Sequence, residues 1–238
     1  ASTIVAVLFY FFIAETKPEA DETEEEESVS QSFGGYIVVM RDVLFMLFIG
    51  VCILMGLVYV NMNASLGVYL RDEFAVPEAG YGMLLSMNAL MVVLFQFAIT
   101  RRIENRPPLL VMAAGMLLYT IGFGMYGFVS TTIMFILAMI ILTIGEMLIA
   151  PVSQALVATF SPEKMRGRYM AVFGISWMVP FAVGPYLAGL IMDNMDSRIL
   201  WYIVALVGMI ATFGFIGLHF KMKENEPATD IKVPIGTV

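Results

Sequence analysis

The sequence predicts an all-α membrane protein: a bundle of six transmembrane helices, plus part of a seventh helix at the N-terminus. Composition is the first reason, since 60% of the 238 residues are hydrophobic, 14% are charged and the mean hydropathy is +0.86. Soluble domains are only about 45–50% apolar. The second reason is that nearly uncharged runs, long enough to cross a ~30 Å hydrocarbon core as helices, occur at 43–70, 81–100, 109–129, 133–160, 170–192 and 199–220.

The parts outside these runs have simpler interpretations. Residues 1–14 are apolar but short, and they lack the basic leader and small-residue cleavage site of a signal peptide. We expect them to be the end of a preceding membrane helix. Residues 15–42 are predicted to be an acidic cytoplasmic linker, because 15–28 holds eight of the 20 acids. The bundle then occupies 43–220 and a cytoplasmic tail 221–238.

The basic residues predict how the chain threads the membrane. Eleven of the 13 Lys and Arg residues lie in alternate connections, and only Arg71 and Arg198 lie in the others. Basic residues next to membrane helices favour the cytoplasm. We therefore expect the linker, the 101–108 and 161–169 loops and the C-terminus to be cytoplasmic.

Small residues predict close helix packing, because they let membrane helices approach each other. The glycines expected to do this are Gly115, Gly122, Gly124, Gly127, Gly208, Gly214 and Gly217. The run 170–192 contains Pro180, Gly184, Pro185 and Gly189, which predicts a bent or locally unwound helix.

Glu146 is the one acid inside a predicted span, near the middle of 133–160. A charge at the bilayer centre costs roughly 2.5–3.5 kcal/mol on insertion scales, so such residues usually face the bundle interior or a watery cavity. Its helical face is small and polar, comprising Thr143, Ala150, Ser153 and Gln154. Because burial disfavours a charged carboxyl, two readings stay open: a group that binds and releases a proton, or a permanently protonated structural one.

Uncharged polar and aromatic side chains are weaker candidates for a substrate cavity. They are Tyr59, Asn61, Asn63, Asn88 and Trp177, together with Thr143 and Gln154 beside Glu146. Gln96 lies two turns from Asn88 on the same predicted helix. Amides in membrane helices also serve as hydrogen-bonding groups between helices, and that reading stays open for each.

The order of segments resembles the C-terminal half of a major facilitator superfamily transporter, from the end of helix six to helix twelve. The stretches SPEKMRGRYMAVFG (161–174) and VGPYLAGLIMD (183–193) are similar to the tenth-to-eleventh loop and eleventh helix of drug/proton antiporter-like members. FQFAITRRIENRPPLL (95–110) matches a gating-loop motif of the family only in part, because Gln96 and Thr100 stand where glycine and aspartate are usual. The resemblance implies gating-loop roles for Arg101, Arg102, Arg106, Arg166 and Arg168, although these also suffice as topology markers.

The resemblance implies a proton-coupled secondary transporter that exports small amphipathic or drug-like molecules by alternating access. Glu146 would carry the proton, the proton gradient would supply the energy, and no cofactor is expected. A proton-driven symporter and a non-transporting membrane subunit or receptor remain alternatives. An intramembrane enzyme is disfavoured, because His219 ends a span, no Asp lies in any span, and metal ligands are too few.

The expected partners are the lipid bilayer, a small-molecule substrate and a missing N-terminal six-helix half on the same or a separate chain, with no nucleic acid. We expect a multi-pass protein of a bacterial inner membrane.

Overall fold

The computed structural model describes residues 29–225, and all of their regular structure is helical. Six helical segments are long and apolar enough to cross a membrane: Val43–Ala64, Glu78–Ile103, Pro108–Met125, Thr132–Phe160, Glu163–Asn194 and Arg198–Glu224. The predicted all-α fold with six membrane spans is therefore confirmed. The predicted partial helix at 1–14, the acidic stretch 15–28 and the tail beyond 225 lie outside the described residues.

The helices follow the predicted order, with boundaries shifted by a few residues. They are α2 (Val29–Arg41), α3 (Val43–Tyr59), α4 (Asn61–Ala64), α5 (Leu66–Phe74), α6 (Glu78–Ile103), α7 (Pro108–Met125), α8 (Thr132–Phe160), the short 3-10 helix η1 (Glu163–Met165), α9 (Arg166–Asn194) and α10 (Arg198–Asn225). Helix α2 occupies the end of the predicted linker. The chain divides into two compact units after Ile37, and the packing described below belongs to the second unit.

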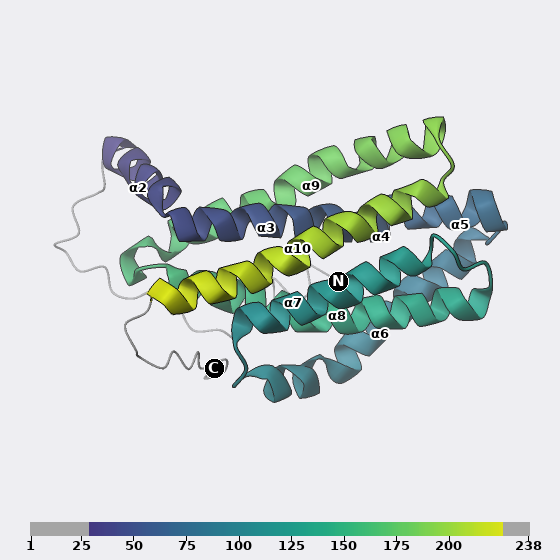
Figure 1. The fold of residues 1–238 in the computed structure, drawn as a ribbon, viewed down its shortest axis with the longest axis horizontal. Coiled ribbons are helices and arrows are strands. Elements are labelled where there is room, and N and C mark those ends of the chain that lie inside the picture. The colour runs from purple at the N-terminus through teal and green to yellow at the C-terminus, as the bar shows by residue number, and fades with distance from the viewer. Residues whose placement is uncertain (1–28, 226–238) are drawn as a thin grey trace, which may run out of the picture. The chain divides into compact units, whose positions relative to one another are not determined.

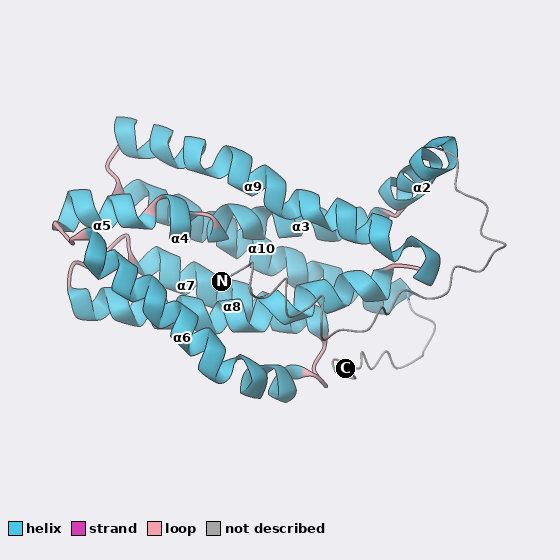
Figure 2. Cartoon of the chain, turned by 180° about the vertical axis from the view of Figure 1, so that it is seen from behind, coloured by secondary structure: helices cyan, strands magenta, loops and turns pink. Residues whose placement is uncertain are grey.

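Helices α7, α8, α10 and α3 form the packed centre of the bundle (Figure 1). Helix α9 packs mainly against α3, and α6 mainly against α8, as the reverse view also shows (Figure 2). Helix α6 is the least enclosed span, because only 6% of its most hydrophobic window is buried. Among the described elements it has α8 and α5 as its substantial neighbours.

Glycines mark the closest helix crossings. A Cβ added at Gly145 of α8 would lie 2.7 Å from the carbonyl oxygen of Gly115 on α7, and one at Gly115 would lie 2.9 Å from that of Gly145. Each glycine therefore makes room for the backbone of the other helix. The packing roles predicted for Gly115, Gly122, Gly124, Gly127, Gly208 and Gly214 are confirmed, because an added Cβ at each meets a neighbouring helix within 3.3 Å. The packing role predicted for Gly217 is not found among the described residues, since nothing from another helix there lies within 4 Å of an added Cβ.

The helix interruption lies in the first span rather than the fifth. Helix α9 stays continuous through Pro180 and Pro185, so local unwinding at these prolines is not found. The predicted run 43–70 instead breaks at Val60 and Ser65, where turns separate α3, α4 and α5. At this break the side chain of Asn61 donates to the carbonyl of Leu57 at 2.8 Å, an interaction that competes locally with the regular helix ladder.

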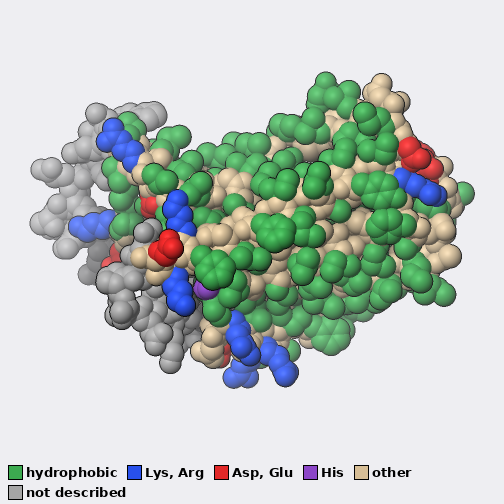
Figure 3. Space-filling model, viewed as in Figure 1, with side chains coloured by type: hydrophobic (Ala, Val, Ile, Leu, Met, Phe, Trp, Pro, Cys, Tyr) green, Lys and Arg blue, Asp and Glu red, His purple; other side chains and the backbone are tan. Residues whose placement is uncertain are grey.

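Charge and hydrophobicity are segregated along the bundle. Figure 3 shows hydrophobic side chains over most of one face, with Lys and Arg gathered toward the end at which α10 finishes and a smaller charged group at the opposite end. A broad apolar belt between charged ends is the surface a bilayer requires. Cys52 of α3 does not reach this surface, because it is fully buried inside the bundle.

Candidate functional site

Glu146 lies in the middle of α8, partly buried, and its carboxylate is held by two neighbouring helices. The Tyr59 hydroxyl of α3 donates to Oε1 at 3.1 Å. The Asn88 amide of α6 donates from Nδ2 to Oε2 at 2.8 Å. No Lys, Arg or His forms an ion pair with Glu146 within the described residues. The carboxylate is therefore held by neutral donors, in a region where a charge is costly to bury.

Thr143 completes this group, which we call the Glu146 cluster: Tyr59, Asn88, Thr143 and Glu146. Asn88 Nδ2 lies 3.0 Å from Thr143 Oγ1, so one amide bridges two side chains of α8. The Thr143 hydroxyl itself donates to the carbonyl of Met139 at 2.8 Å. Thr143 and Glu146 face the same neighbour because residues three apart lie on one side of a helix. Three spans thus meet at the Glu146 carboxylate.

Aromatic rings surround the tyrosine of this cluster. The Trp177 ring of α9 meets the Tyr59 ring edge-on, with centroids 5.5 Å apart. The Tyr119 ring of α7 lies 6.0 Å from the Tyr59 ring and borders Gly145, whose added Cβ would lie 3.0 Å from a Tyr119 ring carbon. The sequence analysis missed Tyr119. Its one sequence signal was a tyrosine in the middle of an otherwise apolar span, which does not reveal which neighbour it faces.

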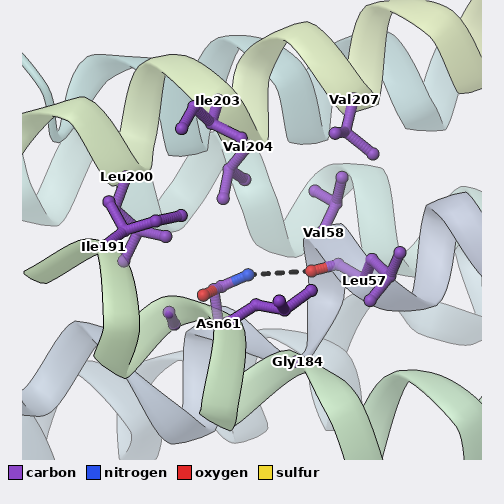
Figure 4. Close-up of a pocket in the computed structure, with 11 residues that line it drawn as sticks. Leu57, Val58, Asn61, Gly184, Ile191, Leu200, Ile203, Val204 and Val207 are labelled. Atoms are coloured by element: carbon purple, nitrogen blue, oxygen red, sulfur yellow. Dashed lines mark hydrogen bonds between the residues drawn. The ribbon is translucent and has the colours of Figure 1, made fainter.

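Asn61 does not join the Glu146 cluster. Its amide donates to Leu57 in its own chain segment, and its Oδ1 accepts from the Ser65 hydroxyl at 2.9 Å. Asn61 lines a separate cavity of about 100 Å³ between the first span, α9 and α10 (Figure 4). The cavity is otherwise apolar, and Figure 4 shows Gly184, Ile191, Leu200 and Val204 around it.

The remaining cavity candidates differ in their exposure. Asn63 and Gln154 are exposed, and their side chains make no hydrogen bond among the described residues. Trp177 is partly buried beside Tyr59. The Glu146 cluster therefore contains three of the seven predicted cavity residues, with Trp177 packed against it and Asn61, Asn63 and Gln154 elsewhere.

The five predicted gating-loop arginines lie in two connections. Arg101 and Arg102 end α6 and are exposed, and the Arg101 guanidinium lies 5.4 Å from the centre of the Phe97 ring. Arg106 is exposed in the α6–α7 loop. Arg166 is exposed at the start of α9, and Arg168, two residues further, is partly buried.

The comparisons with known proteins agree with this architecture. The family description "Major Facilitator Superfamily" matches residues 52–236. The chain is 24% identical over 206 residues to a "Na(+), Li(+), K(+)/H(+) antiporter" of Planococcus maritimus, which covers 77% of this chain and 49% of that protein. It is 25% identical over 157 residues to a "Probable L-galactonate transporter" of Escherichia coli, covering 66% of this chain and 35% of that protein.

A crystal structure of a POT family transporter in complex with 5-aminolevulinic acid superposes with a TM-score of 0.67 at 17% identity. The match covers 83% of this chain and 47% of that one. The chain thus spans about half the length of the antiporter and of the solved transporter that it matches. With a family match over most of its residues and a shared helical fold, the chain belongs to the major facilitator superfamily, whose members are membrane transporters rather than enzymes.

Proposed function

We propose that this chain is the C-terminal half of a proton-coupled secondary transporter and that Glu146 carries the coupling proton. One observation supports this most directly: a carboxylate in the middle of a membrane span is bound by Tyr59 and Asn88 and has no cationic partner among the described residues. Ionisable groups inside membrane spans commonly belong to ion or proton pathways. Because only neutral donors bind the carboxylate among the described residues, Glu146 can become protonated without leaving a buried cation unpaired.

The Glu146 cluster can serve both protonation states. A carboxylate is an acceptor only, whereas a protonated carboxyl must also donate. The Tyr59 hydroxyl can accept as well as donate, so it can reverse its bond when Glu146 gains a proton. Asn88 can present either its amide nitrogen or its oxygen. Tyr59, Asn88 and Glu146 come from three helices. Protonation of Glu146 therefore changes the hydrogen bonds between these helices and, through them, the preferred positions of the helices.

Alternating access connects this event to transport. In this superfamily's fold the substrate lies between two halves that rock about it. The missing half would be six further helices on the same or a separate chain. A change of about 1.4 kcal/mol in the free-energy difference between the two access states changes their population ratio tenfold. A modest change in the hydrogen bonds of Glu146 is therefore enough to shift these populations.

For the substrate, we propose small amphipathic or drug-like molecules moved outward in exchange for protons. The Tyr59–Trp177 aromatic pair beside Glu146 supports this, as does the similarity of residues 161–174 and 183–193 to drug/proton antiporters. The same site would serve a proton-driven symporter, in which substrate and proton move in one direction. We place the protein in a bacterial inner membrane with its C-terminus inside, and we propose that the arginines of the 101–108 and 161–169 loops act at the cytoplasmic gate.

A second candidate substrate is an alkali cation. The Glu146 cluster brings side-chain oxygens of Tyr59, Thr143 and Glu146 together around the Asn88 amide, and hard cations prefer oxygen ligands. One relative is described as an antiporter of Na⁺, Li⁺ and K⁺ against protons. Proton and cation would then compete for the Glu146 carboxylate.

The test that needs no substrate is an infrared titration of the purified protein, with the Glu146→Gln difference spectrum isolating the Glu146 carboxyl band. Loss of the band near neutral pH supports a working proton site. A band that persists to high pH makes Glu146 a permanently protonated structural group and overturns the proposal. Repeating the titration with 100 mM NaCl or KCl against choline chloride separates the two substrate classes, because only a cation site would make the band salt-specific.

A further inference from the structure

Pro151 leaves the carbonyl of Met147, the residue after Glu146, without its donor within the helix. Proline has no backbone N–H, so within α8 (Thr132–Phe160) it cannot donate to the carbonyl four residues earlier, which is that of Met147. In a bilayer no water replaces such a bond, and an unpaired carbonyl costs free energy unless a neighbouring group satisfies it. Met147 directly follows Glu146 in the chain, so this acceptor lies in the same helical turn as the proposed proton site.

Gln96 of α6 supplies the missing donor. Its Nε2 lies 3.0 Å from the Met147 carbonyl oxygen and 3.0 Å from Thr100 Oγ1. A primary amide has two N–H groups, so these two bonds use its full donor capacity. The bond to Thr100 also orients the side chain from within its own helix.

Asn88 and Gln96 together hold α8 at two points. Asn88, two turns earlier on α6, binds Glu146 and Thr143. Helix α6 is otherwise little enclosed, with only 6% of its most hydrophobic window buried. The two amides therefore make three hydrogen bonds from α6 to α8: Asn88 binds Thr143 and the Glu146 carboxylate, and Gln96 binds the carbonyl of the next residue, Met147.

We propose that Gln96 is a positioning residue for Glu146: it replaces the hydrogen bond that Pro151 removes and thereby holds α6 in the register at which Asn88 reaches the carboxylate. The positioning part of this inference rests on the proposed proton site, whereas the pairing of Gln96 with Pro151 does not. Without Gln96 the Met147 carbonyl loses this donor, and among the hydrogen bonds of the described residues those of Asn88 alone then join α6 to α8.

The pairing is tested by a double-mutant cycle on the thermal unfolding of the purified protein. We expect Gln96→Leu to lower Tm by about 2–4 °C. In a Pro151→Ala background, residue 151 regains an N–H that can donate to Met147, so Gln96→Leu should lower Tm by less than half as much. Equal losses in both backgrounds would overturn the pairing. Gln154→Leu is the control for coupling, because this α8 amide makes no hydrogen bond among the described residues and its effect should be the same in both backgrounds.

The positioning role is tested by the infrared band of Glu146. We expect Gln96→Leu to shift the frequency of the band or the pH at which half of it is lost. Gly127→Ala is the destabilised control, because its Cβ would lie 2.6 Å from a ring carbon of Tyr202 on α10. Neither residue lies on α3, α6 or α8, which form the Glu146 cluster, so this variant should leave the band unchanged. A Glu146 band that titrates near neutral pH but ignores Gln96→Leu would overturn the positioning role alone. A wild-type band that does not titrate would overturn the proposed function, while the Tm cycle would still decide whether Gln96 pairs with Pro151.

Discussion

Asn88 and Glu146, 58 residues apart in the chain, meet at 2.8 Å between the amide nitrogen and a carboxylate oxygen. This bond joins α6, the least enclosed of the six spans, to the centre of the bundle. It also supplies each of the two groups with a polar partner, which a buried amide and a buried carboxylate both need in a membrane span.

Replacing Asn88 should therefore disturb both α6 and the carboxylate. Asn88→Leu removes the bonds to Glu146 and Thr143. We expect a loss of about 1–2 kcal/mol in stability, since single hydrogen bonds between membrane helices contribute about 0.6 and at most about 1.7 kcal/mol. Thermal unfolding in detergent measures this. Asn194→Leu, whose amide bonds only its own helix at Leu190, should change Tm little, and an equal loss in both variants would contradict the prediction.

Tyr59→Phe separates the hydroxyl of Tyr59 from its ring. The ring contacts with Trp177 and Tyr119 remain, whereas the donor to Glu146 is lost. We expect roughly tenfold slower proton-driven transport in proteoliposomes, because a hydrogen bond to a charged group contributes about 1.5–3 kcal/mol and its loss changes how readily Glu146 is protonated. Tyr186→Phe, an exposed tyrosine of α9, is the matched control. Unchanged transport in Tyr59→Phe would remove this hydroxyl from the proton site.

The Gly115–Gly145 crossing predicts a sharp difference between two glycines. Gly145→Ala would place a methyl group 2.7 Å from the Gly115 carbonyl oxygen, and overpacking of this kind costs about 1–3 kcal/mol. Gly217→Ala meets no atom within 4 Å, so the better helix propensity of alanine should leave stability equal or slightly raised. Thermal unfolding of both variants measures this difference in stability. Equal destabilisation would show that the α7–α8 distance is not set by this crossing.

Asp42 links the start of α3 to the start of α9. Its Oδ1 accepts from the Phe45 backbone N–H at 3.0 Å, and its Oδ2 accepts from the Tyr169 hydroxyl at 3.1 Å. Asp42→Ala should lower stability by about 1 kcal/mol through the lost N-cap alone. Asp42→Asn keeps a capping oxygen and should recover most of this loss. If the two variants unfold at the same temperature, the cap contributes nothing measurable.

The Arg71–Asp72 pair predicts a weak pH dependence outside the membrane spans. The hydrogen bond that the Arg71 guanidinium donates, at 2.7 Å, lowers the pKa of the Asp72 carboxyl below its ordinary value. Because the pKa of Asp72 is lower in the folded state, its ionised form stabilises the fold at pH values above the ordinary pKa of an aspartate. This contribution is lost as the pH falls through the lowered pKa. Both side chains are more than half exposed, so solvent screens the pair.

Asp72→Asn should consequently change Tm by less than about 2 °C at pH 7 and still less at pH 3. Thermal unfolding at the two pH values provides the measurement. A large loss at pH 7 that disappears at low pH would mean that this exposed pair stabilises the loop far more than its surroundings allow.

The sequence alone predicted the six spans, and it singled out the residue at the centre of the Glu146 cluster. Apolar run length is set by the thickness of the bilayer, so the six helices could be found from composition. Glu146 and Thr143 were placed on one helical face by their spacing, and both now belong to one cluster. These predictions succeeded because each depends on one helix at a time.

Relations between helices could not be predicted in this way. Tyr59 and Asn61 were equal candidates on the first span, yet Tyr59 reaches Glu146 while Asn61 binds its own segment. The difference depends on how each helix is rotated against its neighbours, which is set by packing such as the Gly115–Gly145 crossing rather than by periodicity. For the same reason, the sequence did not predict the position of Tyr119 or the hydrogen bond from Gln96 to the Met147 carbonyl.

The burial of Cys52 has a practical consequence. Because this thiol is fully enclosed and is the single cysteine in the 238 residues, thiol-reactive reagents should leave the folded chain unmodified. A cysteine introduced at exposed Asn63 or Gln154 would then be the one labelled position of this chain. The native sequence therefore needs no cysteine removal before a fluorescent or spin probe is attached at either position.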